Sequence, residues 1–422
     1  MLSKIKSIIA KEILTSGGTP TVEVKVELDS GHTGQASVPF GVSAGIHEAY
    51  TLIDKDPKRY NGQGMLKACN NINTTIADKL VGLDVLKQEK IDKTLIDLDG
   101  TPNKQKLGGN SILAVSLACA RAGAASKNKE LFQYIRDTYK LPFKKFDLPK
   151  PMMVVMEGGK HADNSTDFQE YCYSVSGAPS IREAVRWGEE AYHALKIVLK
   201  DRGLNTNVGN EGAFAPSGID SNEKPLEMMV EAIEKAGYEP GKDIMISLDP
   251  ATSEVYNQEQ KKYILKQEGT GLSSDQMIGL FNDWINKYPI LSIEDGLAED
   301  DWSGWQEFYK NAGDKIKIIG DDLTVTNKDR VQKAIELKAI NAVLIKLNQI
   351  GSLTETIETI MLGKSENFWN VVSHRGGGET NDSFMIDLAV AVNAEYVKVG
   401  PSRGERTSKY NRLMEIEDII KK

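Results

Sequence analysis

Residues 315–347, KIKIIGDDLTVTNKDRVQKAIELKAINAVLIKL, decide the fold class of this chain. Two apolar runs, KIKIIGD and AVLIK, flank a segment with a helical pattern, and they end in Asp321 and Lys346. Runs of this kind that alternate with helical patterns favour a parallel sheet. Charged residues at the carboxyl ends of its strands are typical of the rim where β/α barrels assemble their active sites.

The same pattern repeats along the C-terminal two-thirds of the chain. Each of eight apolar runs carries an ionisable residue, nearly always at or just past the end of the run. Intervals of 24 to 45 residues separate these ionisable residues. These residues are Glu170, Glu211, Asp249, Glu294, Asp321, Lys346, His374 and Lys398. The intervals suit one strand plus one helix, so we predict a (β/α)8 barrel. The loop EGGKHADNSTD (157–167), between the first two runs, is too short for a helix, so we expect an irregular start to the barrel.

The length of 422 residues predicts a second domain beside the barrel. Residues 4–38 alternate apolar and charged positions, as in Val22, Val24 and Val26, and predict antiparallel strands. Residues 64–139 have helical patterns, and the proline-containing stretch KLPFKKFDLPKP (140–151) marks the boundary. We therefore expect a small N-terminal α+β domain over residues 1–139 and the barrel over residues 140–422.

Composition excludes several classes of function. A formal net charge of −8 argues against nucleic acid as a partner. No stretch approaches 18 uninterrupted apolar residues, and the N-terminus has no secretory pattern, so we expect a cytoplasmic protein with no membrane span. The three cysteines lie far apart, which favours reduced, packed thiols over a metal site.

The carboxylates Asp249, Glu294 and Asp321 each end a separate apolar run. Three hard oxygen ligands on neighbouring strand ends suit Mg²⁺, and without a cation like charges so close together would raise one another's pKa. The alternative reading of any one of them is a capping acid or a surface salt bridge. Three in consecutive strand–helix units favour a metal site.

The basic residues add a base and an anion-binding arm. Lys346 and Lys398 interrupt apolar strand patterns, where a lysine is costly unless it is paired, functional or able to reach the rim. A lysine beside another cation and a metal has a lowered pKa and can act as a base. Arg375 follows His374 and precedes three glycines, which suits an anion, and His161 lies in a polar loop typical of a lid. Metal, base and carboxylic acids together fit removal of a proton next to a carboxylate, with enolate stabilisation by the metal.

From end to end the sequence resembles the enolase family. The motifs that carry the resemblance, in the family's order, are PTVEV (20–24), IDLDGTPNK (96–104), NSILAVSLA (110–118), GGKHADN (158–164), SIEDGLAEDDW (292–302), GDDLTVTN (320–327), LIKLNQIGSLTET (344–356), SHR (373–375) and RGERTSKYNRLMEIE (403–417). The resemblance implies an enolase-type irregular barrel and reversible, Mg²⁺-dependent dehydration of 2-phosphoglycerate to phosphoenolpyruvate. It also implies a homodimer or a higher homo-oligomer.

The resemblance further implies a role for each site residue. Lys346 would be the base that removes the C2 proton, and Glu211, with Glu170 beside it, the acid that assists loss of hydroxide. Two Mg²⁺ ions would bind, one held by Asp249, Glu294 and Asp321 and the other placed with the help of Ser43, in the loop from Phe40 to Glu48. The substrate contacts implied are His161, His374, Arg375, Lys398 and Ser43.

Four segments depart from the family pattern: residues 15–18, 40–44, 210–213 and 376–378. The reshaped loop after Arg375 motivates an alternative, an enolase paralogue that dehydrates a related phospho- or phosphono-2-hydroxy acid. A second alternative is a weakly active paralogue with a binding role, and the terminal Lys421-Lys422 pair resembles the lysine ends through which some enolases bind plasminogen. No signal in the sequence indicates surface display. The segment DFQEYC (167–172) lacks the Lys-x-Lys that racemases and cycloisomerases of the wider superfamily often carry.

Overall fold

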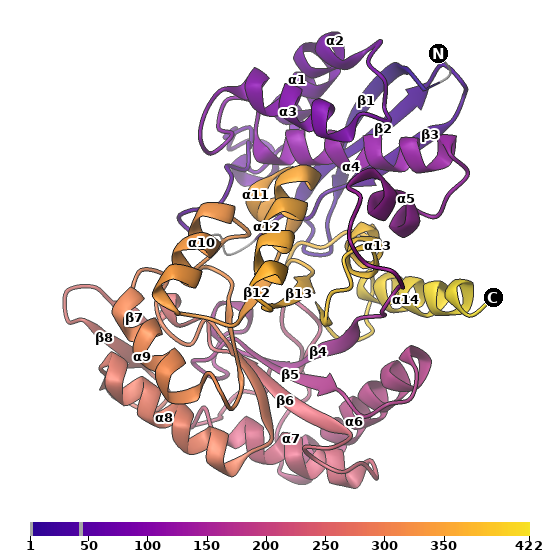
Figure 1. Ribbon diagram of the computed structural model, residues 1–422. Coiled ribbons are helices and arrows are strands. Elements are labelled where there is room, and N and C mark those ends of the chain that lie inside the picture. Colours follow the sequence, from indigo (N-terminus) through magenta and orange to yellow (C-terminus); the bar gives the residue numbers. More distant parts are fainter. Residues whose placement is uncertain (1–2, 42–44) are drawn as a thin grey trace.

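The N-terminal part forms a sheet covered by helices, and the rest of the chain forms a closed barrel below it (Figure 1). The computed structural model describes residues 3–41 and 45–422. The N-terminal sheet has the order β1-β2-β3, with antiparallel pairs, as the alternation in residues 4–38 predicts. Its strands are β1 (Ile5–Leu14), β2 (Pro20–Leu28) and β3 (Thr33–Ser37).

Helices cover one face of this sheet. They are η1 (Tyr60–Gly62), α1 (Leu66–Asn71), η2 (Ile72–Ile76), α2 (Ala77–Leu80), α3 (Gln88–Asp99), α4 (Gly109–Ser126) and α5 (Leu131–Thr138). The small-residue helix α4 packs closely on β3. A Cβ on Gly34 would lie 2.2 Å from the carbonyl oxygen of Ala118, so only glycine permits this approach. The domain boundary expected at residues 139 and 140 lies between α5 and the first barrel strand and stays a prediction.

The barrel closes in the order β10-β11-β12-β13-β14-β4-β5-β6, which confirms the predicted fold class. Its strands are β4 (Lys150–Glu157), β5 (Glu170–Val175), β6 (Ile244–Asp249), β10 (Ile290–Glu294), β11 (Lys317–Gly320), β12 (Ala342–Ile345), β13 (Trp369–Ser373) and β14 (Tyr396–Val399). The irregular start is also confirmed. Only the short turn η3 (Gly159–His161) lies between β4 and β5, so β5 runs antiparallel to both of its neighbours.

Eight longer helices and a short one, α11, follow or join the barrel strands. They are α6 (Ile181–Asp201), α7 (Lys224–Lys235), α8 (Ser274–Lys287), α9 (Trp302–Ala312), α10 (Lys328–Leu337), α11 (Leu347–Ile350), α12 (Leu353–Ser365), α13 (Phe384–Ala391) and α14 (Arg406–Ile420). A small antiparallel sheet, which the sequence did not lead us to expect, follows the turn η4 (Thr252–Glu254). It consists of β7 (Tyr256–Asn257), β8 (Lys262–Leu265) and β9 (Thr270–Leu272).

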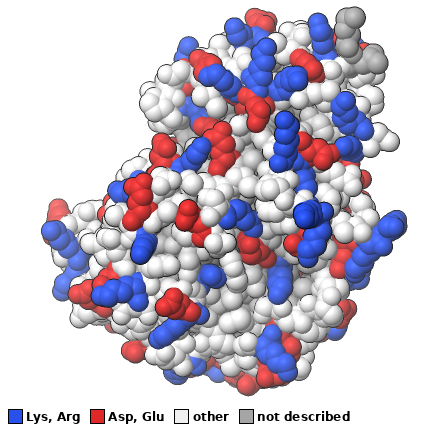
Figure 2. Space-filling view, viewed as in Figure 1, with Lys and Arg blue, Asp and Glu red and all other residues white. Residues whose placement is uncertain are grey.

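Buried polar contacts fix the N-terminal domain on the barrel. Asp92, which is fully buried, accepts hydrogen bonds from the backbone N–H of Thr354 at 2.9 Å and from its hydroxyl at 2.6 Å. Lys104 Nζ lies 2.9 Å from Glu355 Oε1. Both contacts join the first domain to the start of α12. Basic and acidic side chains are interspersed over both domains on the face in Figure 2. Among the described residues, no helix combines the length and apolar character that crossing a bilayer requires.

Candidate active site

The barrel brings most of the predicted residues to one rim. Asp249 and Glu294 end β6 and β10, and Asp321 and Lys346 directly follow β11 and β12. Glu170 begins β5 instead of ending it, contrary to the simple pattern of run ends. Because β5 is antiparallel to its neighbours, its first residue lies at the same rim and pairs with Asp249.

Lys398, in β14, lies at the centre of this rim. Its Nζ is 2.8 Å from Glu170 Oε2, 2.8 Å from Asp249 Oδ2 and 2.8 Å from Glu294 Oε1. β14 and β10 are four positions apart in the eight-stranded order, so this lysine reaches across the barrel. Burial lowers the pKa of Lys398, but the three carboxylates outweigh it and raise the pKa well above its usual range. The lysine is therefore charged and cross-links three strands.

Lys346 pairs with Asp321 at a distance of 2.5 Å between Nζ and Oδ2. The other oxygen of Asp321 accepts a hydrogen bond from Gln349 Nε2 at 2.7 Å. Burial lowers the pKa of Lys346, but Asp321 outweighs burial and the pKa is raised. With Asp321 free to bind it, Lys346 is an ammonium group. It becomes a base only when another cation takes over the charge of Asp321.

Carboxylate oxygens at this rim fit a hard divalent cation. Burial and the neighbouring Asp249 raise the pKa of Glu294, so the cluster favours added positive charge. Ligand oxygens of Asp295, Asp321 and Asp322 lie within 4.8 Å of one another, close enough for one ion. Asp295 also accepts hydrogen bonds from the backbone N–H groups of Asp321 and Asp322, at 3.0 and 2.7 Å. The donor set thus suits Mg²⁺, and the assignment of Asp249, Glu294 and Asp321 as its ligands stays a prediction.

Glu211 lies in a turn between α6 and α7, not at the end of a strand. A short bridge from Phe214 to Met156 of β4 holds this turn on the barrel, and a second bridge from Phe214 to Val208 closes the turn itself. Glu211 Oε2 is 3.0 Å from His374 Nε2, and Glu211 Oε1 is 3.4 Å from His161 Nδ1. The structure therefore joins three residues that lie far apart in the sequence.

The acid cluster is buried and holds a proton. Burial lowers the pKa of both His161 and His374, although the charge of Glu211 acts to raise both. Burial and Glu211 raise the pKa of Glu170 well above its usual range. Burial also acts to raise the pKa of Glu211, but His374 outweighs it and holds that pKa well below its usual range. The Glu170–Glu211 pair thus carries one proton, as two neighbouring carboxyls commonly do.

The distance between His161 Nδ1 and Glu170 Oε1 is also 3.4 Å. Ligand atoms of His161, Glu170 and Glu211 lie within 4.8 Å of one another. The same holds for Asp295, Asp321 and Asp322. An imidazole nitrogen, however, is a poor ligand for Mg²⁺. This cluster therefore fits proton transfer better than it fits magnesium.

Glu157, which ends β4, was missed by the sequence analysis. Its carboxyl group is buried and accepts hydrogen bonds from the backbone of the Glu211 turn. The same signal that selected the eight rim residues could have found it, since Glu157 ends the apolar run PMMVVM. The pattern places Glu157 at the start of the loop 157–167, whereas the strand includes it.

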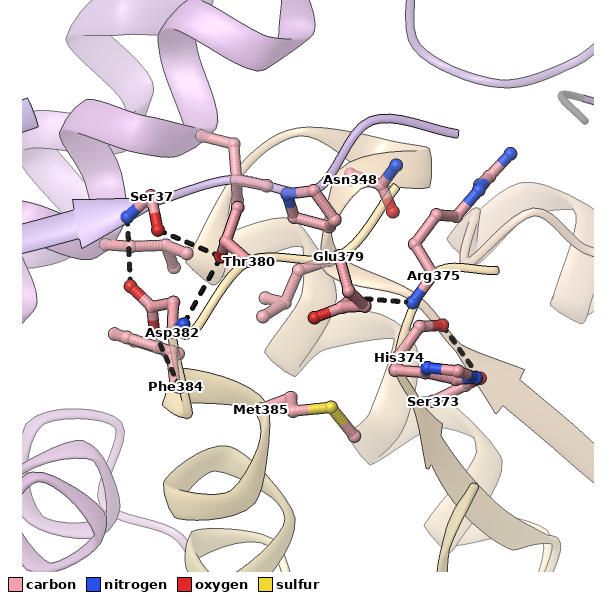
Figure 3. Close-up of a pocket in the computed structure, with 14 residues that line it drawn as sticks. Ser37, Asn348, Ser373, His374, Arg375, Glu379, Thr380, Asp382, Phe384 and Met385 are labelled. Atoms are coloured by element: carbon pink, nitrogen blue, oxygen red, sulfur yellow. Dashed lines mark hydrogen bonds between the residues drawn. The ribbon is translucent and has the colours of Figure 1, made fainter. Parts of the chain in front are cut away.

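Residues 375–380 follow β13 and form the candidate anion-binding arm, which is held from two sides. Arg375 donates from Nη1 and Nη2 to the two oxygens of Glu48, both at 2.9 Å, and its backbone N–H donates to Glu379 Oε1 at 2.8 Å. Glu379 in turn pairs with the buried Lys409 of α14 at 2.6 Å. Figure 3 shows Arg375, Glu379 and Thr380 beside a cavity of about 40 Å³ between the two domains.

Three of the segments that depart from the family pattern touch one another at this arm. Ser16 N donates to Glu379 O at 2.8 Å, and Phe40 N donates to Gly378 O at 2.8 Å. A Cβ on Gly378 would lie 2.0 Å from the carbonyl oxygen of Phe40, so the contact requires a glycine. The described residues of these segments, 15–18, 40–41 and 376–378, therefore belong to one packed unit. Ser43 lies outside the described residues.

Comparison with protein families agrees with this geometry. The model of the enolase C-terminal TIM barrel domain matches residues 145–422, and the model of the enolase N-terminal domain matches residues 5–135. The chain belongs to the enolase family. The two matches confirm the barrel with a separate N-terminal domain, and they make this enolase-family chain a lyase of the enolase superfamily.

Proposed function

We propose that this enolase-family chain catalyses the reversible dehydration of 2-phosphoglycerate to phosphoenolpyruvate, the reaction of glycolysis and gluconeogenesis. The observation that supports this most directly is one pocket lined by Lys346, Glu170, His161 and Arg375. It combines a lysine, a carboxyl group that holds a proton and a cation for an anionic group. A cytoplasmic homodimer or higher homo-oligomer with two Mg²⁺ ions per site remains the expected context.

The placement of base and acid suits an elimination. β12, before Lys346, and β5, which begins with Glu170, are four positions apart in the barrel order and so face each other. Lys346 removes the C2 proton from one face of the substrate. The Glu170–Glu211 pair donates its proton to the departing hydroxyl group on the opposite face. Groups on opposite walls favour departure of the proton and the hydroxyl from opposite faces.

Asp249, Glu294 and Asp321 would hold a Mg²⁺ ion, which supplies stabilisation of the negative charge that develops on the substrate carboxylate. With its charge neutralised by that ion, Asp321 would no longer hold the ammonium form of Lys346, and Lys346 would be able to act as the base. Lys398 adds a fixed positive charge beside the same carboxylates. Arg375 binds the phosphoryl group, for which a planar guanidinium group is well suited.

A related substrate is the second candidate. Both terminal nitrogens of Arg375 already donate to Glu48, and the arm beside it is packed against the altered segment at Ser16. A different anionic group, such as a phosphonate, is therefore a reasonable alternative to the phosphate ester.

Turnover of 2-phosphoglycerate with Mg²⁺, followed by the ultraviolet absorbance of the enol product, tests the proposal. We expect kcat/KM of about 10⁴ M⁻¹s⁻¹ or more, the lower part of the usual enzyme range. A value near the background rate, with faster turnover of a phosphono-2-hydroxy acid, would favour the second candidate. Absence of turnover with both would contradict dehydration as the function.

A further inference from the structure

Glu157 is a buried carboxyl group at the site that the proposed reaction does not use. It ends β4 and is 1% exposed. Its backbone N–H donates to Phe214 O at 3.0 Å, so the strand end is joined to the turn at residues 207–215. This turn carries Glu211.

The side chain of Glu157 holds the backbone of that turn. Glu211 N donates to Glu157 Oε1 at 3.2 Å and to Oε2 at 3.1 Å, and Ala213 N donates to Oε1 at 3.0 Å. A Cβ on Gly209 would lie 2.5 Å from Glu157 Cδ, so the turn closes tightly around the carboxyl group. Because one donor is the N–H of Glu211 itself, the position of Glu211 depends directly on Glu157.

The turn is also held by contacts with His161 and at the carboxyl group of Glu211. Asn210 N donates to the carbonyl oxygen of His161 at 3.1 Å, and Glu211 Oε2 lies 3.0 Å from His374 Nε2. Glu211 is thus held at its backbone by Glu157 and at its carboxyl group by His374. Groups that act in proton transfer must be placed accurately, since an error of about 1 Å can cost on the order of 100-fold in rate.

We propose that Glu157 is a positioning residue for Glu211, and that it sets the rate of hydroxide loss through the backbone of the turn it holds. This inference rests on the proposed dehydration. Burial and Glu211 raise the pKa of Glu157 to about 8, so the group keeps a proton near pH 7. A protonated carboxyl group still offers a carbonyl oxygen to both N–H donors, and so does the amide of glutamine.

The test compares Glu157→Ala with Glu157→Gln. Glu157→Ala removes the acceptor of both N–H groups, so we expect kcat for dehydration to fall on the order of 100-fold while KM changes by about twofold or less. Glu157→Gln keeps the acceptor oxygen and should stay within about tenfold of the wild type. Exchange of the C2 proton with solvent deuterium should continue near the wild-type rate in both variants, because Lys346 performs that step.

Glu417 supplies a matched control. It is 3% exposed and, like Glu157, accepts two backbone N–H groups, those of Ile181 and Arg182, at 3.0 and 3.1 Å. It lies on α14, and its two amide partners begin α6 on the outside of the barrel. Glu417→Ala should lower the melting temperature to a similar extent as Glu157→Ala, with kcat unchanged.

Three outcomes overturn the inference. One is wild-type dehydration by Glu157→Ala. Another is an equal loss of exchange and dehydration, which would indicate general disruption of the site. The third is an equal loss of kcat in Glu417→Ala. Failure of the proposed function is distinguishable from these outcomes, since it would show as absent dehydration by the wild-type protein itself.

Discussion

The two walls of the site are built in different ways. The cation wall consists of Asp249, Glu294, Asp321, Lys346 and Lys398, and both of its lysines lie 2.5 to 2.8 Å from carboxylate oxygens. The acid wall consists of Glu157, His161, Glu170 and Glu211, and the contacts of its histidine with Glu170 and Glu211 are longer, at 3.4 Å. Glu170 joins the two walls through its contact with Lys398.

The difference shows how the two halves of the reaction depend on the fold. The cation wall stands on parallel strand ends, and its ion pairs neutralise most of its charge. The acid wall stands on an antiparallel strand and a turn, so hydrogen bonds to backbone must place its acid. We therefore expect changes in the cation wall to remove proton abstraction or metal binding, and changes in the acid wall to affect hydroxide loss alone.

The largest effect is expected for Lys346→Ala. General bases contribute up to about 10⁴-fold in rate, so dehydration should fall by that order, and exchange of the C2 proton should be lost with it. Assays of both reactions on one preparation check this. Lys364→Ala, which removes another lysine paired with a carboxylate at 2.7 Å, is the control and should retain full activity. Surviving exchange in Lys346→Ala would assign the base elsewhere.

A smaller loss is expected for Glu211→Gln. This change breaks the Glu170–Glu211 pair that holds the proton, so dehydration should slow on the order of 10³-fold, because a poor leaving group then departs without assistance. Exchange of the C2 proton should persist, since the cation wall is unchanged. Nuclear magnetic resonance in deuterated buffer measures the exchange. If both reactions fell together, the division between the two walls would be wrong.

Mg²⁺ that binds to the cation wall should raise the melting temperature of the protein measurably. An ion that binds only the folded protein adds about 2.7 kcal/mol at 100 times its Kd, so the melting temperature should rise by several degrees. Asp249→Asn should reduce this rise, while the control Glu417→Gln should keep it. Thermal unfolding with EDTA and with added Mg²⁺ provides the comparison. An undiminished rise in Asp249→Asn would remove Asp249 from the metal site.

The smallest effect concerns pH and the acid wall. The pKa of Glu157 is about 8 in the folded protein against 4.5 ordinarily, so between these pH values the folded state keeps a proton that the unfolded chain has released. The stability contributed by this group therefore falls as pH rises through that window, by at most about 1.4 kcal/mol per pH unit. Glu157→Gln lacks this dependence and should gain on the wild type by roughly 1 kcal/mol between pH 7 and pH 8. Denaturant titrations measure the difference, and a constant difference would contradict the raised pKa.

The positions of the cation-wall residues could be predicted from the sequence, while their roles stay predictions. Asp249, Glu294, Asp321 and Lys346 end or directly follow strands at the expected rim. The reason is local: a strand in a parallel barrel points its carboxyl end to one rim, so each residue follows from its own strand. The acid wall could be predicted only in part. Glu211 lies in a turn and not at the predicted end of a strand, and the pattern of run ends does not include Glu157.

By itself the sequence determined the barrel, its irregular start and the identity of the rim residues, because the hydrophobic periodicity of strands and helices is a local property of the sequence. The tertiary structure decided which residues face each other. Barrel closure sets β14 opposite β10, so Lys398 meets Glu294, and the antiparallel β5 brings Glu170 to Asp249. The turn around Glu157 likewise depends on contacts between residues more than 50 positions apart. Such contacts depend on the closed fold as a whole, and no local pattern encodes them.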